Sequence, residues 1–148
     1  MRKSQRIGAH GEDLAARILD GIGIRQLERI GTPVRQIDGR VIYGAPVAAD
    51  FRGVNPIYPR FYGTPYCVEA LIGQSVLVEV KTVEHNLHWS DFREHQPGKL
   101  SEHTDLGGLS LVVWVHSSGV YVMRWPIEGF APGRGITPQM AAGFDIGG

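Results

Sequence analysis

The sequence predicts an α/β or α+β domain built on a mixed β-sheet with helices on its flanks. An amphipathic helical pattern opens the chain, β-rich runs follow it, and a second short helical segment precedes the last two runs. The expected order is therefore one helix, three or four strands, one helix and two strands. With 148 residues, the chain is long enough for one domain with its own core.

The first helix is expected from Ile7 to Asp20. Apolar residues recur along this segment at helical spacing, and Gly21 and Gly23 follow it as a C-terminal stop. Glu12 shares the spacing of the small and apolar residues around it. We therefore expect Glu12 to lean toward the packed side of this helix.

Strands are expected after this helix. "VRQIDGRVIYG" places Asp38-Gly39 between two alternating segments, which is the strongest short-range signal for a hairpin. "VAADFRGV" is expected to form the next strand, with Asp50 in it, and "SVLVEVKTVE" a further strand over residues 75–84. The segment "NPIYPRFYGTP" between them is rich in Pro, Gly and Tyr and predicts a loop.

The second half of the chain predicts a helix and another hairpin. Pro97 suits the first turn of a short helix that reaches about Asp105 and stops at Gly107-Gly108. "LSLVVWVHSSGVYVMRW" predicts two strands about a His-Ser-Ser-Gly turn. The Gly- and Pro-rich tail, about residues 128–148, is expected to be ordered only where it docks.

Composition excludes several classes of protein. No apolar run approaches the roughly 18 residues of a membrane span, and the basic N-terminus lacks the apolar region of a secretory signal. Cys67 is the single cysteine, so an internal disulfide framework is excluded. A cytoplasmic protein without a membrane partner is expected.

Charge is distributed unevenly along the chain although the net charge is zero. Residues 1–60 carry ten Lys or Arg against six Asp or Glu, whereas residues 61–148 carry five against nine. This asymmetry permits a basic face and an acidic pole on one domain, and a randomly mixed surface remains an equal alternative.

The strand at 75–84 carries two charges in an otherwise apolar run. Side chains alternate along a strand, so the valines at 76, 78 and 80 share one face, and Glu79 and Lys81 share the other with Leu77. A half-exposed surface pair is one explanation. Asp50, in the preceding strand, favours another: two carboxylates from adjacent strands that converge on a divalent cation, with Lys81 beside it.

The arrangement Asp50…Glu79-Val80-Lys81 resembles the motif of the PD-(D/E)xK nucleases, the restriction-endonuclease-like superfamily. The surrounding segments resemble RecU-like Holliday junction resolvases in order, from about residue 8 to 126. These segments are "GAHGEDLAARIL", "ERIGTPVRQI", "VEVKTVEHNLHWSDFREHQPGKLSEH" and "GLSLVVWVHSSGVYVMRW". The resemblance implies a restriction-endonuclease-like mixed sheet flanked by helices in a single nuclease domain over residues 1–148.

The resemblance also implies roles for individual residues. Lys81 matches the lysine that orients the attacking water or stabilises charge on phosphorus, and Glu12 matches a first-helix glutamate. The implied metal ligands are Asp50, Glu79, the side-chain oxygen of Gln96 and the backbone carbonyl of Val80. Two features depart from the family: Ala48 replaces a threonine, and an insertion at about residues 55–73 lengthens the gap between the two carboxylates.

Basic residues are candidate contacts to DNA phosphates, beginning in an N-terminal arm at about residues 1–6. A solvated surface position is an equal alternative for any one of the arginines. The candidates are Arg2, Lys3, Arg6, Arg35, Arg52, Arg60 and His95.

The resemblance implies an Mg²⁺-dependent endodeoxyribonuclease, with Mn²⁺ as a substitute, that resolves four-way DNA junctions. Paired nicks on opposing strands imply two sites in a homodimer. We expect it in the cytoplasm of a bacterial or phage-infected cell. Two alternatives remain open: another endonuclease of the same superfamily, restriction- or repair-type, and a catalytically silent DNA-binding module of the same fold.

Overall fold

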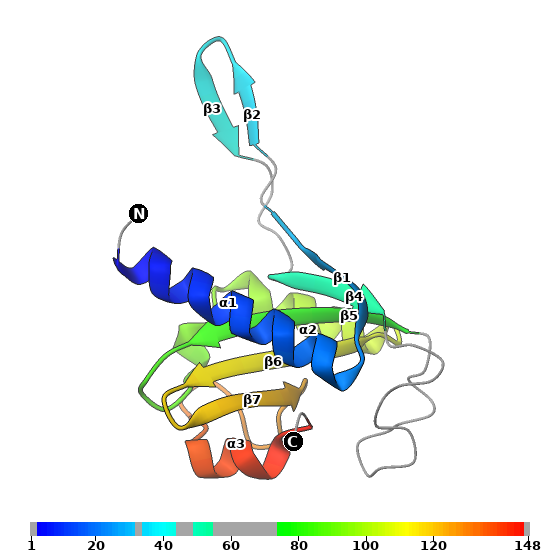
Figure 1. Cartoon of the computed structure of the whole chain (residues 1–148), viewed down its shortest axis with the longest axis vertical. Helices are drawn as coiled ribbons and strands as arrows, with labels where there is room; N and C mark the ends of the chain where they lie inside the picture. The colour runs from blue at the N-terminus through cyan, green and yellow to red at the C-terminus, as the bar shows by residue number, and fades with distance from the viewer. Residues whose placement is uncertain (1–2, 32–33, 44–48, 55–73, 147–148) are drawn as a thin grey trace.

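The computed structural model describes residues 3–31, 34–43, 49–54 and 74–146. It is an α+β fold with a five-stranded mixed sheet flanked by helices, which confirms the predicted fold class (Figure 1). The insertion at 55–73 and Cys67 lie outside the described residues. Among the described residues, no helix combines the length and apolar character needed to cross a bilayer.

The sheet has the strand order β1-β4-β5-β6-β7. Neighbouring strands are antiparallel except for β5 and β6, which run parallel. Helix α2 is the crossover between these two parallel strands. The strand bounds are β1 Arg25–Arg29, β4 Phe51–Val54, β5 Ser75–Thr82, β6 Leu109–His116 and β7 Gly119–Arg124.

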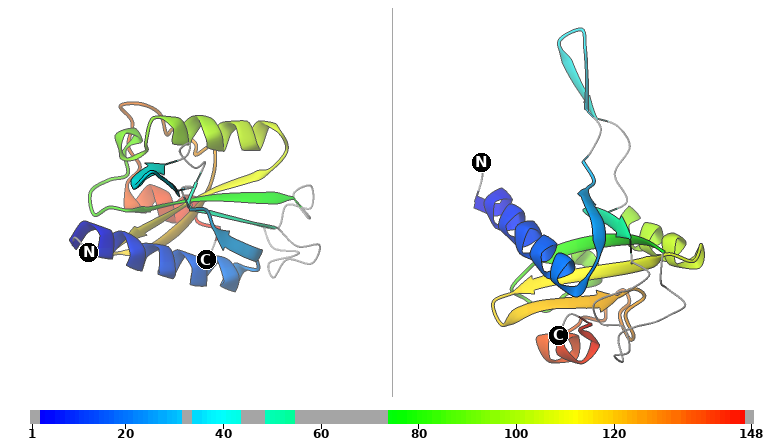
Figure 2. Two further views of the ribbon diagram at one scale, coloured as in Figure 1. Left: turned by 90° about the horizontal axis from the view of Figure 1, so that it is seen from above. Right: turned by 45° about the vertical axis from the view of Figure 1, so that its right-hand side comes forward.

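Helices cover both faces of this sheet, as the left view of Figure 2 shows for α1 (Lys3–Ile22) and α2 (His95–Asp105). The core on the α1 face contains Ala15 and Leu19 together with the valines at 76, 78 and 80. The core on the other face contains Leu77, Leu100 and an aromatic group. Because both faces are buried, the strands at the centre are nearly continuous apolar runs.

The expected turns are present, but α1 runs to Ile22, so Gly21 lies inside the helix and only Gly23 acts as its C-terminal stop. Gly23, with a φ of 106°, follows the last residue of α1, and Gly107, with a φ of 96°, follows α2. Asp38 and Gly39 have φ values of 50° and 74°, as a type I′ turn requires. They join β2 (Val34–Ile37) to β3 (Arg40–Tyr43) in a separate two-stranded hairpin that projects from the sheet (Figure 1).

The structure contains three elements that the sequence did not predict: strand β1, the short 3-10 helix Trp89–Asp91 and helix α3. Strand β1 forms the edge of the sheet beside β4, and its side chains are largely exposed. Helix α3 (Pro138–Phe144) lies in the tail, begins at the N-cap Thr137 and buries Ala141 in the core. In addition, α1 begins at Lys3 and not at Ile7, so residues 3–6 of the predicted basic arm are helical.

Candidate active site

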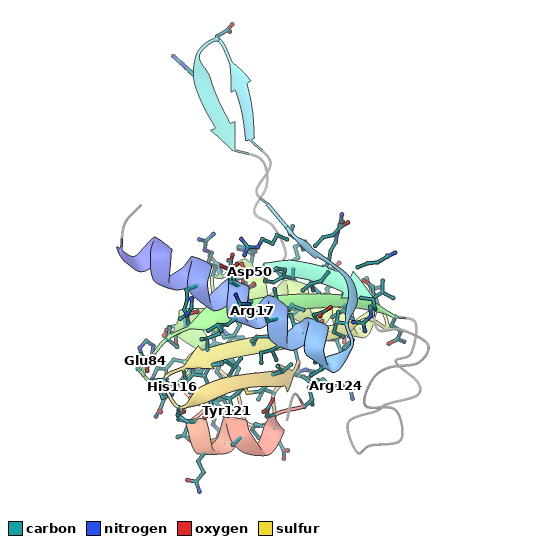
Figure 3. The ribbon with its side chains drawn as sticks, viewed as in Figure 1. Arg17, Asp50, Glu84, His116, Tyr121 and Arg124 are labelled. Carbon is teal, nitrogen blue, oxygen red and sulfur yellow. The ribbon has the colours of Figure 1, made fainter. Side chains whose placement is uncertain are left out.

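Asp50 sits where β4 begins to pair with β5. Its backbone N–H donates to the carbonyl of Val78 at 3.0 Å, and its Oδ2 accepts from the N–H of Val80 at 2.8 Å. The side chain therefore takes a place that a backbone carbonyl would occupy in a continuing strand, which fixes the carboxylate against β5. Figure 3 labels Asp50 near the start of β4, above α1 in this view.

Glu79 is almost fully buried, with 2% of its surface exposed. Its Oε1 accepts from Gln96 Nε2 at 2.8 Å and lies 3.0 Å from Lys81 Nζ. Its Oε2 is buried and has no hydrogen-bond partner among the described residues. A buried carboxylate oxygen without a donor is costly, so this oxygen fits a ligand to a cation.

The pKa of Glu79 reflects its burial and the nearby Asp50 carboxylate. Burial, followed by the nearby Asp50 carboxylate, raises the pKa of Glu79 from its ordinary value of 4.5 to about 7, although Lys81 opposes the rise. Close contact with the Asp50 side chain raises the pKa of Glu79 further. A cation placed between two such carboxylates would remove this repulsion, and the donor set therefore fits a hard divalent ion.

Gln96 connects the charged residues to the start of α2. Its amide oxygen accepts from Lys81 Nζ at 2.8 Å and from the N–H of Arg93 at 2.9 Å, while its amide nitrogen donates to Glu79. Two donors thus occupy the oxygen that the resemblance assigns to the metal. In this structure Gln96 positions Glu79 and Lys81. To bind a metal ion, its amide oxygen would have to give up the hydrogen bond from Lys81 or the one from Arg93.

Glu12 approaches the same carboxylates from α1. Burial, together with Asp50, raises the pKa of Glu12, and Arg29 on β1, 3.8 Å away, counteracts the rise. Gly11 makes this approach possible, because a Cβ on Gly11 would lie 2.0 Å from Oγ1 of Thr82 at the end of β5. Helix α1 therefore crosses β5 closely enough to bring Glu12 to Asp50.

Asp50, Glu79, Lys81 and Gln96 border one polar cavity of about 340 Å³, whereas Glu12 is not among its lining residues. Sequence reasoning anticipated most of its lining but missed Arg93, which no motif marks. The lining residues are Ile30, Ala49, Asp50, Glu79, Val80, Lys81, Arg93, His95 and Gln96. In the part of the chain that the structure describes, no three His, Cys, Asp or Glu side chains are arranged as a metal site. Mg²⁺ is commonly held by one or two carboxylates with water and phosphate, so the pair Asp50 and Glu79 remains the candidate.

The predicted DNA contacts fall in different places. His95 lines the cavity, and Arg52 on β4 is exposed and paired with Glu28 at 3.0 Å. Lys3 and Arg6 lie in α1 and Arg35 lies in β2, whereas Arg2 and Arg60 lie outside the described residues, as does Ala48.

The other histidines of the second half make local contacts. His85 pairs with Asp91 at 2.8 Å, and His103 bonds to the hydroxyls of Ser110 and Ser75.

No protein-family model and no curated protein sequence matches this chain.

Proposed function

We propose that this protein is an Mg²⁺-dependent endodeoxyribonuclease of the PD-(D/E)xK type that resolves four-way DNA junctions. The observation that carries the proposal is the meeting of Asp50, Glu79 and Lys81 at one polar cavity, where a buried Glu79 oxygen has no donor. The choice of a junction as substrate is supported by the order of RecU-like motifs in the sequence. The proposal includes a homodimer in the cytoplasm of a bacterial or phage-infected cell.

Phosphodiester hydrolysis requires a water oxygen to bond to phosphorus while the bond to the 3′-oxygen breaks and that oxygen takes a proton. Asp50 and Glu79 would hold the cation, which when bound makes water more acidic and neutralises charge on the phosphate. Lys81 has three N–H donors, and Glu79 and Gln96 engage two of them. The third donor is left for the water or for a phosphate oxygen.

Cleavage of a labelled four-way junction with and without Mg²⁺ tests the proposal. We expect paired nicks that require the cation, and a loss of at least about 10³-fold in rate for Asp50→Asn, Glu79→Gln or Lys81→Ala, since each removes a group that stabilises developing charge. Lys99→Ala is the matched control, because Lys99 is an exposed lysine on α2 that pairs only weakly with Glu102 at 4.0 Å.

Each alternative gives a distinct result in the same assay. Equal cutting of linear duplex or flap DNA would indicate another endonuclease of the superfamily. DNA binding without cutting in any divalent cation would indicate a silent module. Wild-type rates in the Asp50, Glu79 or Lys81 variants would refute the site assignment.

A further inference from the structure

Arg93 is a charged side chain at the cavity that the motif-based assignment does not use. It lies between the short 3-10 helix Trp89–Asp91 and helix α2, and it lines the cavity with Asp50, Glu79 and Lys81. The residue is exposed. Its guanidinium forms no ion pair or hydrogen bond with the residues that the structure describes.

The backbone of Arg93 is held by hydrogen bonds, whereas its guanidinium has no partner among the described residues. Its N–H donates to Gln96 Oε1 at 2.9 Å, and its carbonyl accepts from the Gln96 N–H at 3.0 Å. The preceding residue, Phe92, is buried, and its ring lies 4.8 Å from Lys81 Nζ. Gln96 therefore fixes the backbone of Arg93 relative to both Glu79 and Lys81.

Three arginines on or beside the outer part of the sheet are paired, whereas Arg124 on β7 has no side-chain partner among the described residues. Arg25 on β1 pairs with Asp20, Arg29 pairs with Asp13, and Arg52 pairs with Glu28. Lys81, the other cation at the cavity, is engaged by Glu79 and Gln96. Arg93 lines the same cavity, and its five guanidinium N–H donors have no partner among the described residues.

We infer that Arg93 binds a backbone phosphate of the nucleic-acid substrate and positions the phosphodiester against Asp50, Glu79 and Lys81. A guanidinium matches a phosphate through two parallel N–H···O bonds, and an unpaired one loses no protein partner when it does so. This inference rests on the nuclease function proposed above.

The test compares Arg93→Gln and Arg93→Lys with Arg124→Gln. Arg124 on β7 is the matched control, because it is exposed, has no side-chain partner among the described residues and lies apart from Asp50 (Figure 3). Binding of fluorescent duplex and junction DNA is measured by anisotropy over a range of salt concentrations, in the Glu79→Gln background so that no cutting occurs.

We expect Arg93→Gln to weaken binding about tenfold at low salt and to reduce the slope of log affinity against log salt by about 0.9, the value for one phosphate contact. Arg93→Lys should retain most of the slope and lose part of the affinity. Arg124→Gln should change neither quantity. Thermal melting should be equal for all three variants.

Methylphosphonate linkages, which are neutral, locate the contact. At one position near the cut, the neutral linkage should slow cleavage by the wild type about tenfold. The same linkage should not slow cleavage by Arg93→Gln any further, because both changes remove the same interaction. If Arg93→Gln matches Arg124→Gln in affinity, slope and cleavage while Asp50→Asn no longer cuts, the Arg93 inference is wrong and the nuclease proposal stands. If the wild type neither binds nor cuts DNA, both are wrong.

Discussion

Two charged regions of the sheet differ in how their charges are held. On the outer strands β1 and β4, the ion pairs are exposed: Arg52 and Glu28 keep 67% and 62% of their side-chain surface in solvent. On the central strand β5, Lys81 and Glu79 keep 12% and 2%. Exposed pairs of the first kind contribute little to stability, whereas a buried carboxylate depends on every partner around it.

The difference explains where substitutions should matter. Water readily replaces a partner on β4, whereas Gln96 holds the buried Glu79 through a hydrogen bond in a site with little exposed surface. The central group also carries a defect that the outer pairs lack, namely the buried oxygen of Glu79 with no donor. Stability is given up there because, as we propose, the site is complete only with cation and substrate.

Gln96→Ala is expected to produce the largest combined effect. It removes the donor to Glu79 and the acceptor of both Lys81 and Arg93, which leaves buried polar groups unsatisfied. We expect a loss of about 2–3 kcal/mol in the free energy of unfolding and a 10- to 100-fold loss in cleavage rate. Urea denaturation and junction cleavage measure the two quantities.

Gln139→Ala is the control for this variant, because Gln139 is exposed on α3. An effect of Gln96→Ala as small as that of Gln139→Ala would show that the side chain does not organise the site.

The pH dependence of stability isolates Glu79. Its folded pKa of about 7 exceeds its ordinary value of 4.5, so between these values the folded protein binds more protons than the unfolded chain. The contribution of Glu79 to the free energy of unfolding is therefore complete below about pH 4.5 and is lost as the pH rises through about 7. At 1.36 kcal/mol for each pKa unit, it amounts to at most about 3 kcal/mol.

Melting of the wild type and of Glu79→Gln from pH 4.5 to 8, without divalent cations, measures this contribution. The difference between the two proteins is needed because desolvation lowers the pKa of His103, which acts in the opposite sense. We expect Glu79→Gln to be the more stable protein at pH 8, and Mg²⁺ to stabilise only the wild type. A difference that does not vary with pH would contradict the raised pKa.

Gly11→Ala tests how closely α1 must approach β5. The added methyl group would overlap Thr82 Oγ1, and overpacking of this kind costs about 1–3 kcal/mol. Cleavage should also fall, because the helix that moves carries Glu12. Thr82→Ala in the same chain should restore part of the stability, since it removes the atom that is overlapped.

Gly8→Ala on the same helix is the control. A Cβ at Gly8 meets nothing within 4 Å, so the higher helix propensity of alanine should stabilise the protein by about 0.5–1 kcal/mol. Equal behaviour of the two alanine variants would show that the contact with Thr82 can relax without cost.

Sequence patterns predicted the helices, strands and turns that are determined by residues close together in the sequence. The alternation in β5, the Asp38-Gly39 turn and the helix ending near Asp105 are all present. Strand β1 was missed because "RQLER" is exposed and shows no apolar alternation, and α3 because it is short and lies in a Gly- and Pro-rich tail.

The residues of the candidate site also divide into those that local patterns predicted and those that depend on tertiary packing. Alternation along β5 and the resemblance placed Glu79 and Lys81 on one face with Asp50 beside them, and the structure brings all three to one cavity. The orientation of Gln96 and the place of Arg93 at the cavity depend on how α2 docks against β5, which no local pattern encodes.

Arg52→Gln should have the smallest effect. Arg52 Nε and Nη2 both bond to Glu28 Oε2, at 3.1 and 3.0 Å, but both side chains are well exposed. We expect a change of no more than about 0.5 kcal/mol in the free energy of unfolding, and a smaller one at high salt, because solvent and ions screen the pair. Urea denaturation at low and high salt measures the change. A loss comparable to that of Gln96→Ala would mean that exposure does not separate the two charged regions, and the contrast between β4 and β5 would then need another cause.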